Sequence, residues 1–214
     1  MENKYKISIA KPFGPTIAKV TIPNEIVLKL NSYIDETIKD EEKSKSLDMG
    51  NKLAGQVSQE FKLDNEFCSS SGWLKFLGDC VGNWLKLSGM KEIKNFELIN
   101  SWAVRQFKNE YNPAHWHNGH VSGVGYLKVP NELGDKHQGS KRYNPNGNLE
   151  LIHGTRQFLS QSTFRVKPKV GDIYFFPNYM MHAVYPFKDT EEERRSVSFN
   201  AFVDQGIYNV YAND

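Results

Sequence analysis

Seven short strand candidates fill the second half of the chain, from Phe96 to Val203. Their sequences are FELINSWAVRQF, HVSGVGYLKV, NLELIH, STFRVKP, GDIYFFP, HAVYPF and RRSVSFNAFV, and turn residues such as Gly, Pro and Asn separate them. Many short strands with helices segregated to one end are typical of a β-sandwich or a small barrel. The pattern therefore predicts a mostly β, α+β fold that is backed by helices.

The residues before Phe96 are predicted to be mainly helical. YKISIA and TIAKVTIP first form a short hairpin. A helix begins near Asn24, whose side chain can cap it, and NKLAGQVSQEF and GWLKFLGDCVGNWLKLSG continue in helical period. The first helix buries one face, namely Ile26, Leu30, Ile34 and Ile38. The last buries the stripe Trp73, Phe76, Leu77, Cys80, Trp84 and Leu87.

The length of 214 residues suits a single domain. We expect residues 1–95 to be a helical support after the hairpin and residues 96–204 to be the β core. Lys and Arg (27) nearly balance Asp and Glu (25), so no basic surface for nucleic acid or an anionic membrane is expected.

Cys68 and Cys80 are expected to be free thiols. The first residues resemble no signal peptide, and no apolar run suits a membrane helix, so a cytoplasmic protein is expected.

Three of the six histidines, His115, His117 and His120, lie together in NPAHWHNGH, directly before a predicted strand. Such residues can be solvated loop side chains. They can also be metal ligands, in which case a further ligand must come from a distant part of the sequence. His182 is the candidate, because it follows an apolar strand and a Pro-Asn turn in GDIYFFPNYMMHAVYPF.

Arg194 opens the last strand, twelve residues after His182. Because side chains alternate along a strand, Arg194, Ser196, Ser198 and Asn200 share one face, and Val197, Phe199, Ala201 and Val203 share the other. The apolar face should pack on helices. A guanidinium with a nearby hydroxyl suits a carboxylate bound in a cavity, whereas Arg195 should point away from it.

This ordered set resembles the Fe(II)/2-oxoglutarate-dependent dioxygenases, in which His-x-Asp/Glu comes first, a second His follows later, and Arg-x-Ser comes last. The residues are most similar to the prolyl-hydroxylase-like 2-oxoglutarate oxygenases of bacteria and tailed phages, and the resemblance covers roughly residues 100–203. It implies a double-stranded β-helix, or jelly-roll, core.

The resemblance also implies a role for each matching residue. His115 and His182 match two iron ligands, and Arg194 and Ser196 match the pair that binds the distal carboxylate of 2-oxoglutarate. Tyr126 occupies the position of a tyrosine that often reaches this carboxylate. Lys128 shares the strand phase of Tyr126 and is a fallback partner, although a surface position suits a lysine better.

The sequence departs from the family at His117, which stands where the acidic ligand is expected. Residues i and i+2 of a strand point the same way, so His117 can still bind the metal, with one unit less negative charge at the site. Three readings remain open: His117 completes a three-histidine site, a remote carboxylate such as Glu150 or Asp135 does so, or water does. We favour the first. The other histidines are expected to be near the site or at the surface (His120), at a strand end (His153) and in a loop (His137).

The implied activity is that of an Fe(II)- and 2-oxoglutarate-dependent dioxygenase. Such an enzyme uses O₂ to hydroxylate a C–H bond, of peptidyl proline or of a small molecule, and releases succinate and CO₂. One alternative is a cupin-like three-histidine metal protein, a hydrolase or a sensor, that does not use 2-oxoglutarate. Another is an inactive jelly-roll interaction module.

The polar segment Asn131–Asn148 is either a surface loop or an active-site lid.

Overall fold

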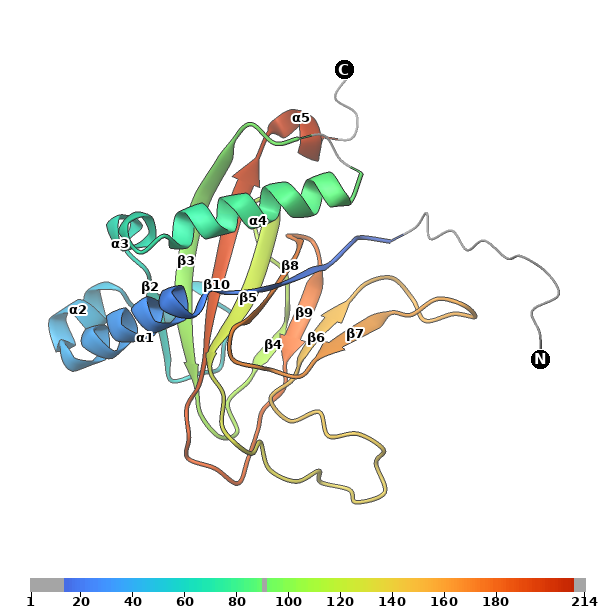
Figure 1. Ribbon diagram of the computed structural model, residues 1–214. Coiled ribbons are helices and arrows are strands. Elements are labelled where there is room, and N and C mark those ends of the chain that lie inside the picture. The colour runs from blue at the N-terminus through green and yellow to red at the C-terminus, as the bar shows by residue number, and fades with distance from the viewer. Residues whose placement is uncertain (1–13, 90–91, 210–214) are drawn as a thin grey trace.

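Two antiparallel sheets form the framework of the computed structural model, which describes residues 14–89 and 92–209 (Figure 1). The larger sheet has the order β1-β8-β5-β10-β3-β2, and the smaller has the order β4-β9-β6-β7. The strands are β1 Ala18–Thr21, β2 Gln59–Lys62, β3 Phe96–Gln106, β4 Asn112–His115, β5 Val121–Lys128, β6 Leu149–Ile152, β7 Thr163–Val166, β8 Asp172–Pro177, β9 Met181–Val184 and β10 Arg194–Val203. The predicted mostly β fold with supporting helices is confirmed, and all seven predicted strands are present.

Helices cover the outer face of the larger sheet (Figure 1). α1 Asn24–Lys39 and α4 Trp73–Leu87 lie across this face, and the other helical elements are α2 Glu41–Ser46, η1 (a 3-10 turn) Gly50–Lys52, α3 Asn65–Ser70 and α5 Gln205–Tyr208. The predicted buried face of α1 is confirmed, because Leu30 and Ile34 are fully buried. The predicted cap is wrong: Pro23 occupies the N-cap position, and no side chain caps the helix.

The stripe predicted on α4 is correct except at its end. Trp73, Leu77 and Trp84 are buried, but Leu87 is 88% exposed. The buried face also includes Val81 and Leu85, the latter at its margin. At 100° per residue, Leu87 lies roughly a quarter turn from the centre of that face, so it points into solvent.

The helix predicted for NKLAGQVSQEF is wrong. This segment contains only the short turn η1 and then enters β2, which pairs with β3 through residues such as Glu60↔Val104 and Phe61↔Ala103. The backbone hydrogen bonds to β3 and the burial of Phe61 outweigh the local helical period. Of the predicted N-terminal hairpin, YKISIA lies outside the described residues, and β1 pairs with β8.

Strand β10 lies inside the larger sheet between β5 and β3, and its alternation divides two environments. Val197, Phe199 and Ala201 are fully buried in the core beneath the helices, as predicted. Arg194, Ser196 and Ser198 face the other way and line a cavity. This cavity is also lined by residues of the smaller sheet, including His182 and Val184, so it lies between the two sheets.

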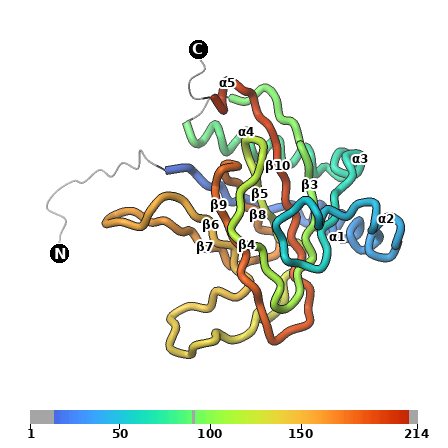
Figure 2. The backbone as a smooth tube through the Cα atoms, turned by 180° about the vertical axis from the view of Figure 1, so that it is seen from behind, coloured from blue at the N-terminus to red at the C-terminus, as the bar shows by residue number. Residues whose placement is uncertain are grey.

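The segment 131–148 contains no helix or strand, and Figure 2 shows it as a loop that projects between β5 and β6. Its shape is held internally, since the Asn146 side-chain amide donates hydrogen bonds to the carbonyls of Leu133, Gly134 and Asp135. None of its residues lines the cavity.

Cys68 and Cys80 are free thiols, as predicted. Among the described helices, none is long and apolar enough to cross a bilayer.

Candidate metal centre

Three histidines converge between the sheets. His115 ends β4 and pairs directly with His182 of β9. His117 lies just beyond the end of β4, where its backbone N–H donates to the Asn178 carbonyl (3.1 Å). The chain then turns at Gly119, whose φ of 89° is readily adopted only by glycine. The tertiary contact to Asn178, rather than strand pairing, therefore positions His117.

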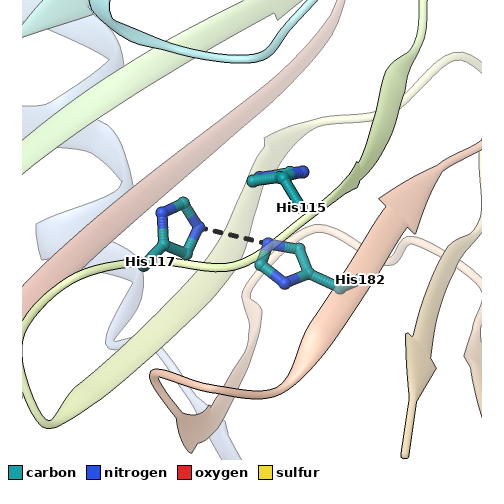
Figure 3. Close-up of side chains that lie close together, drawn as sticks. All are labelled: His115, His117 and His182. Atoms are coloured by element: carbon teal, nitrogen blue, oxygen red, sulfur yellow. Dashed lines mark hydrogen bonds between the residues drawn. The ribbon is translucent and has the colours of Figure 1, made fainter.

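The ring nitrogens of the three histidines form a potential metal site (Figure 3). One ring nitrogen of each of His115, His117 and His182 lies within 4.8 Å of the other two. The Nε2 atoms of His117 and His182 are 3.2 Å apart. Two ligands at about 2.1 Å from one ion and at right angles would be roughly 3 Å apart, so this spacing suits adjacent positions on a metal.

Backbone carbonyls fix the tautomers of two of these rings. Nδ1–H of His115 donates to the Pro113 carbonyl (2.7 Å), and Nδ1–H of His182 donates to the Met180 carbonyl (3.0 Å). A neutral imidazole has one N–H, so the Nε2 atoms of both rings carry lone pairs. Without a metal, Nε2–H of His117 can donate to Nε2 of His182; a bound ion would replace this proton.

Burial keeps the histidines neutral. It lowers the pKa of His117 to about 3 and that of His182 to about 4, and the neighbouring imidazoles add to both shifts. Burial also lowers the pKa of His115. All three rings are therefore available as neutral ligands near neutral pH, and protons do not compete with a metal there.

The structure does not bring the alternative carboxylates to the histidines. Glu150 is occupied elsewhere, because it accepts hydrogen bonds from Arg165 (2.5 Å) and Tyr185 (2.9 Å). Asp135 is exposed in the loop. Across residues 14–89 and 92–209, the one group of His, Cys, Asp or Glu side chains with this metal-site spacing is the three histidines.

The remaining histidines lie outside the cluster. His120 is buried, its Nδ1 is 3.1 Å from both the N–H and the carbonyl of Val203, and its ring stacks on Tyr208 at 3.9 Å. It therefore ties the start of β5 to the end of β10. His153 and His137 are exposed.

Arg194 is a buried cation with unused donors that lines the same cavity. Its Nη1 donates to Oε1 of Gln106 (2.9 Å), but its Nε and Nη2 have no hydrogen-bond partner among the described residues. Ser196 and Ser198 line the cavity on the same face of β10. Arg195 points to the other face, where it pairs with Asp35 and Glu193 (2.7 Å each).

Tyr126 packs against Arg194, whose guanidinium carbon is 5.1 Å from the centre of the tyrosine ring. The Tyr126 hydroxyl is buried and also lacks a partner within the described chain. Burial raises its pKa to about 12, so it remains a neutral donor. Lys128 does not share this face: a bulge in the β5–β10 pairing places it opposite Arg195, and its ammonium lies 3.4 Å from Asp35. The fallback role of Lys128 is therefore wrong.

Three further residues of the cavity were not predicted from the sequence. Gln106 holds Arg194, and its amide group also donates to the carbonyls of Glu110 and Tyr185. Trp102 packs edge-on against His117, with ring centres 5.5 Å apart. Glu60 lines the cavity from β2. The strand register of β3 and β2 places all three, and no local pattern in the sequence reveals that register.

The burial of Glu60 predicts how the free energy of unfolding of the metal-free protein depends on pH. Burial, with a contribution from Asp48, raises its pKa to about 7. The folded state then binds more protons than the unfolded state between about pH 4.5 and pH 7, so stability falls as pH rises through this window. We expect Glu60→Gln to raise the free energy of unfolding at pH 8 by up to about 3 kcal/mol, with little effect at pH 5.

Urea denaturation of the chelator-treated variant at the two pH values measures this difference. The exposed Glu97 of β3 gives a matched control, and Glu97→Gln should change neither value. Equal effects of Glu60→Gln at pH 5 and pH 8 would show that Glu60 does not titrate in this window.

The core of the chain matches a known family. Residues 100–200 match the family described as "Putative 2OG-Fe(II) oxygenase". No curated protein matches the sequence. The matched residues run from β3 into β10 and include every histidine of the cluster as well as Arg194 and Ser196.

Solved structures share the fold at low sequence identity. A prolyl-4-hydroxylase of Pseudomonas putida has a TM-score of 0.53 at 15% identity, and the alignment covers 86% of this chain and 91% of that one. The viral collagen prolyl hydroxylase of Paramecium Bursaria Chlorella virus-1 gives 0.52 at 16% identity, with 86% and 94% covered. A Trichoplax adhaerens prolyl hydroxylase, solved with a hypoxia inducible factor peptide fragment, gives 0.54 at 13% identity, with 92% and 87% covered.

Two antiparallel sheets thus enclose three histidines and a buried arginine in a jelly-roll framework. The family match over residues 100–200 and the shared fold make the chain similar to the Fe(II)/2-oxoglutarate-dependent oxygenases. The resemblance seen in the sequence is confirmed at this level.

Proposed function

We propose that this oxygenase hydroxylates a C–H bond of its substrate while 2-oxoglutarate is converted to succinate and CO₂. Peptidyl proline is the first substrate to test, because the similar structures include prolyl hydroxylases. The observation that carries the proposal is the set of unpaired donors of Arg194, which lines the cavity of the three histidines, and of Tyr126, which packs against Arg194.

The histidine cluster fits an Fe(II) ion. His115, His117 and His182 would bind it through neutral imidazole nitrogens, a ligand type that suits iron. Three protein ligands on one side leave positions for 2-oxoglutarate and O₂. The Nδ1 bonds of His115 and His182 to backbone carbonyls hold both rings in the orientation that a metal needs.

The pocket beside the cluster fits the distal carboxylate of 2-oxoglutarate. Nε and Nη2 of Arg194 offer two parallel donors on one edge of the guanidinium, which is the geometry of a bidentate carboxylate pair. The Tyr126 hydroxyl and Ser196 add further donors nearby. Without such a ligand, the donors remain buried and unsatisfied, which is unfavourable. A metal hydrolase would have no use for this carboxylate site.

The iron and 2-oxoglutarate supply the oxidising chemistry when bound, and the chain supplies binding and exclusion of water. Arg194, held by Gln106, sets the position of the cosubstrate. Apolar residues such as Val104, Val124 and Leu149 line the same cavity and keep water from it. The histidines are neutral, so they bind the metal without contributing a negative charge.

The direct test is succinate formation from 2-oxoglutarate by the protein with Fe(II), measured with and without proline-containing peptides and small-molecule candidates. We expect slow succinate formation alone and faster formation with a substrate. A protein that binds a metal but never consumes 2-oxoglutarate would instead be a cupin-like metal protein. One that binds neither would be an inactive module.

Variants of His117 test its place as the third ligand. We expect His117→Asp to retain iron and some turnover, because aspartate restores the usual acidic ligand of the family. His117→Ala should bind iron more weakly, by more than about 100-fold, as for loss of any direct ligand. His120→Ala should keep the iron affinity of the parent and lose only stability, because His120 bonds to Val203 and not to the cluster.

The measurement is Fe(II) affinity together with 2-oxoglutarate decarboxylation across these three variants. If His120→Ala lost the metal while His117→Ala kept it, the ligand set would have to be redrawn around His120.

A further inference from the structure

Glu60 extends from β2 into the cavity of the histidines. Its residue is 2% exposed, and it pairs with Val104, which lines the same cavity. The next residue, Phe61, pairs with Ala103 in the core under the helices. Because successive side chains of a strand alternate, this register directs the Glu60 carboxylate to the cavity side of the sheet.

The Glu60 carboxylate has no cationic or hydrogen-bonding partner within the described residues. The influences on its pKa are burial and Asp48, and both raise it; no lysine or arginine lowers it. The other buried acidic side chains of the fold do have partners: Glu150 bonds Arg165, and Asp172 pairs with Lys19. A buried carboxylate without a partner is strongly unfavourable, so a partner from outside the chain would remove a real energetic cost.

The backbone before β2, at Gly55, lies close to the Glu60 carboxylate. A Cβ atom at Gly55 would lie 2.7 Å from Oε1 of Glu60 and 2.9 Å from Oδ1 of Asn112. Such distances are too short for a side-chain contact, so a larger residue here would displace the ends of these two side chains. Two acceptor oxygens therefore gather at one wall of the cavity, formed by Leu53, Ala54, Glu60 and Asn112.

The other charges of the cavity leave Glu60 unmatched. The three histidines are neutral, and Arg194 would be neutralised by the distal carboxylate of 2-oxoglutarate. We propose that Glu60 is the substrate-recognition residue of this oxygenase and that the substrate presents a positively charged nitrogen to its carboxylate, close to the C–H bond that is oxidised. This inference rests on the proposed function, because it places the substrate in the cavity of the iron and 2-oxoglutarate.

Equilibrium binding to the Fe(II)-loaded protein with 2-oxoglutarate, in the absence of oxygen, tests the inference. The probes are three pairs, each with one positively charged and one neutral member: Nα-acetyl-lysine methylamide and its norleucine analogue, Nα-acetyl-arginine methylamide and its citrulline analogue, and prolinamide and N-acetylprolinamide. We expect the charged member of at least one pair to bind about tenfold more tightly or better, as for a charge-assisted contact.

Variants assign this preference to Glu60. Glu60→Gln should reduce the preference to about twofold or less, and Glu60→Lys should reverse it. Gly55→Ala keeps the charge but displaces the carboxylate, so it should also weaken binding of the charged probe. Glu97→Gln, a matched change outside the cavity, should keep the parent preference.

The inference is overturned if no pair shows a preference for its charged member, or if Glu60→Gln retains that preference. It is also overturned if Glu60→Gln lowers Fe(II) affinity and leaves the probe preference intact, because Glu60 would then serve the metal. Failure of the proposed function looks different: the parent protein would form no succinate from 2-oxoglutarate with any probe. The binding preference and the consumption of 2-oxoglutarate are thus separate results.

Discussion

His182→Ala and His115→Ala will each abolish turnover and reduce Fe(II) affinity by more than about 100-fold, while the protein remains folded. Loss of a group that only supports a metal ligand already lowers metal affinity about 10- to 100-fold, so loss of the ligand itself must lower it more. His182 is the more severe case, because its Nε2 lies 3.2 Å from Nε2 of His117 and the residue is only 5% exposed. Its removal leaves two ligands and an apolar space.

Metal titration and succinate formation measure the effect, and circular dichroism with thermal unfolding checks the fold. The exposed His153 provides the control, because His153→Ala removes an imidazole outside the cluster and should behave as the parent. Near-parental iron affinity in His182→Ala would contradict the three-histidine site and, with it, the proposed function.

Arg194→Lys will weaken 2-oxoglutarate binding by about 1–3 kcal/mol, roughly 5- to 150-fold in dissociation constant. Lysine keeps the positive charge but has no planar pair of donors, and it cannot reproduce both the bond to Gln106 and a bidentate contact. The change should leave Fe(II) affinity nearly unchanged, because Arg194 is not a metal ligand. Titration of the iron-loaded protein with 2-oxoglutarate in the absence of oxygen measures it.

The neighbouring arginine offers a matched control for Arg194. Arg195 is equally buried, but it pairs with Asp35 and Glu193 on the opposite face of β10. Arg195→Lys should therefore lower the free energy of unfolding and leave 2-oxoglutarate affinity close to that of the parent. The reverse result, with Arg195→Lys losing 2-oxoglutarate and Arg194→Lys keeping it, would show that the strand phase assigned to the site is wrong by one residue.

The strands and the phase of β10 could be predicted from the sequence because they depend on local patterns. Turn residues bound each strand, and strict alternation separates Val197 and Phe199 from Arg194 and Ser196. The same reasoning failed for NKLAGQVSQEF, where the pattern suggests a helix and pairing with β3 imposes a strand. It also failed for Lys128, because a bulge shifts the phase of β5 by one residue. The division into residues 1–95 and 96–204 within one domain stays a prediction.

Local sequence patterns place His115 and His117 before one strand, His182 beside another, and Arg194 with Ser196 on the last. How these residues meet depends on the tertiary fold. The pairing of β4 with β9 sets His115 opposite His182, and the bond between His117 and Asn178 brings the third imidazole in without a strand to hold it. Glu60 and Gln106 join the cavity for the same reason. Their positions depend on register between strands far apart in the chain, which sequence periodicity does not encode.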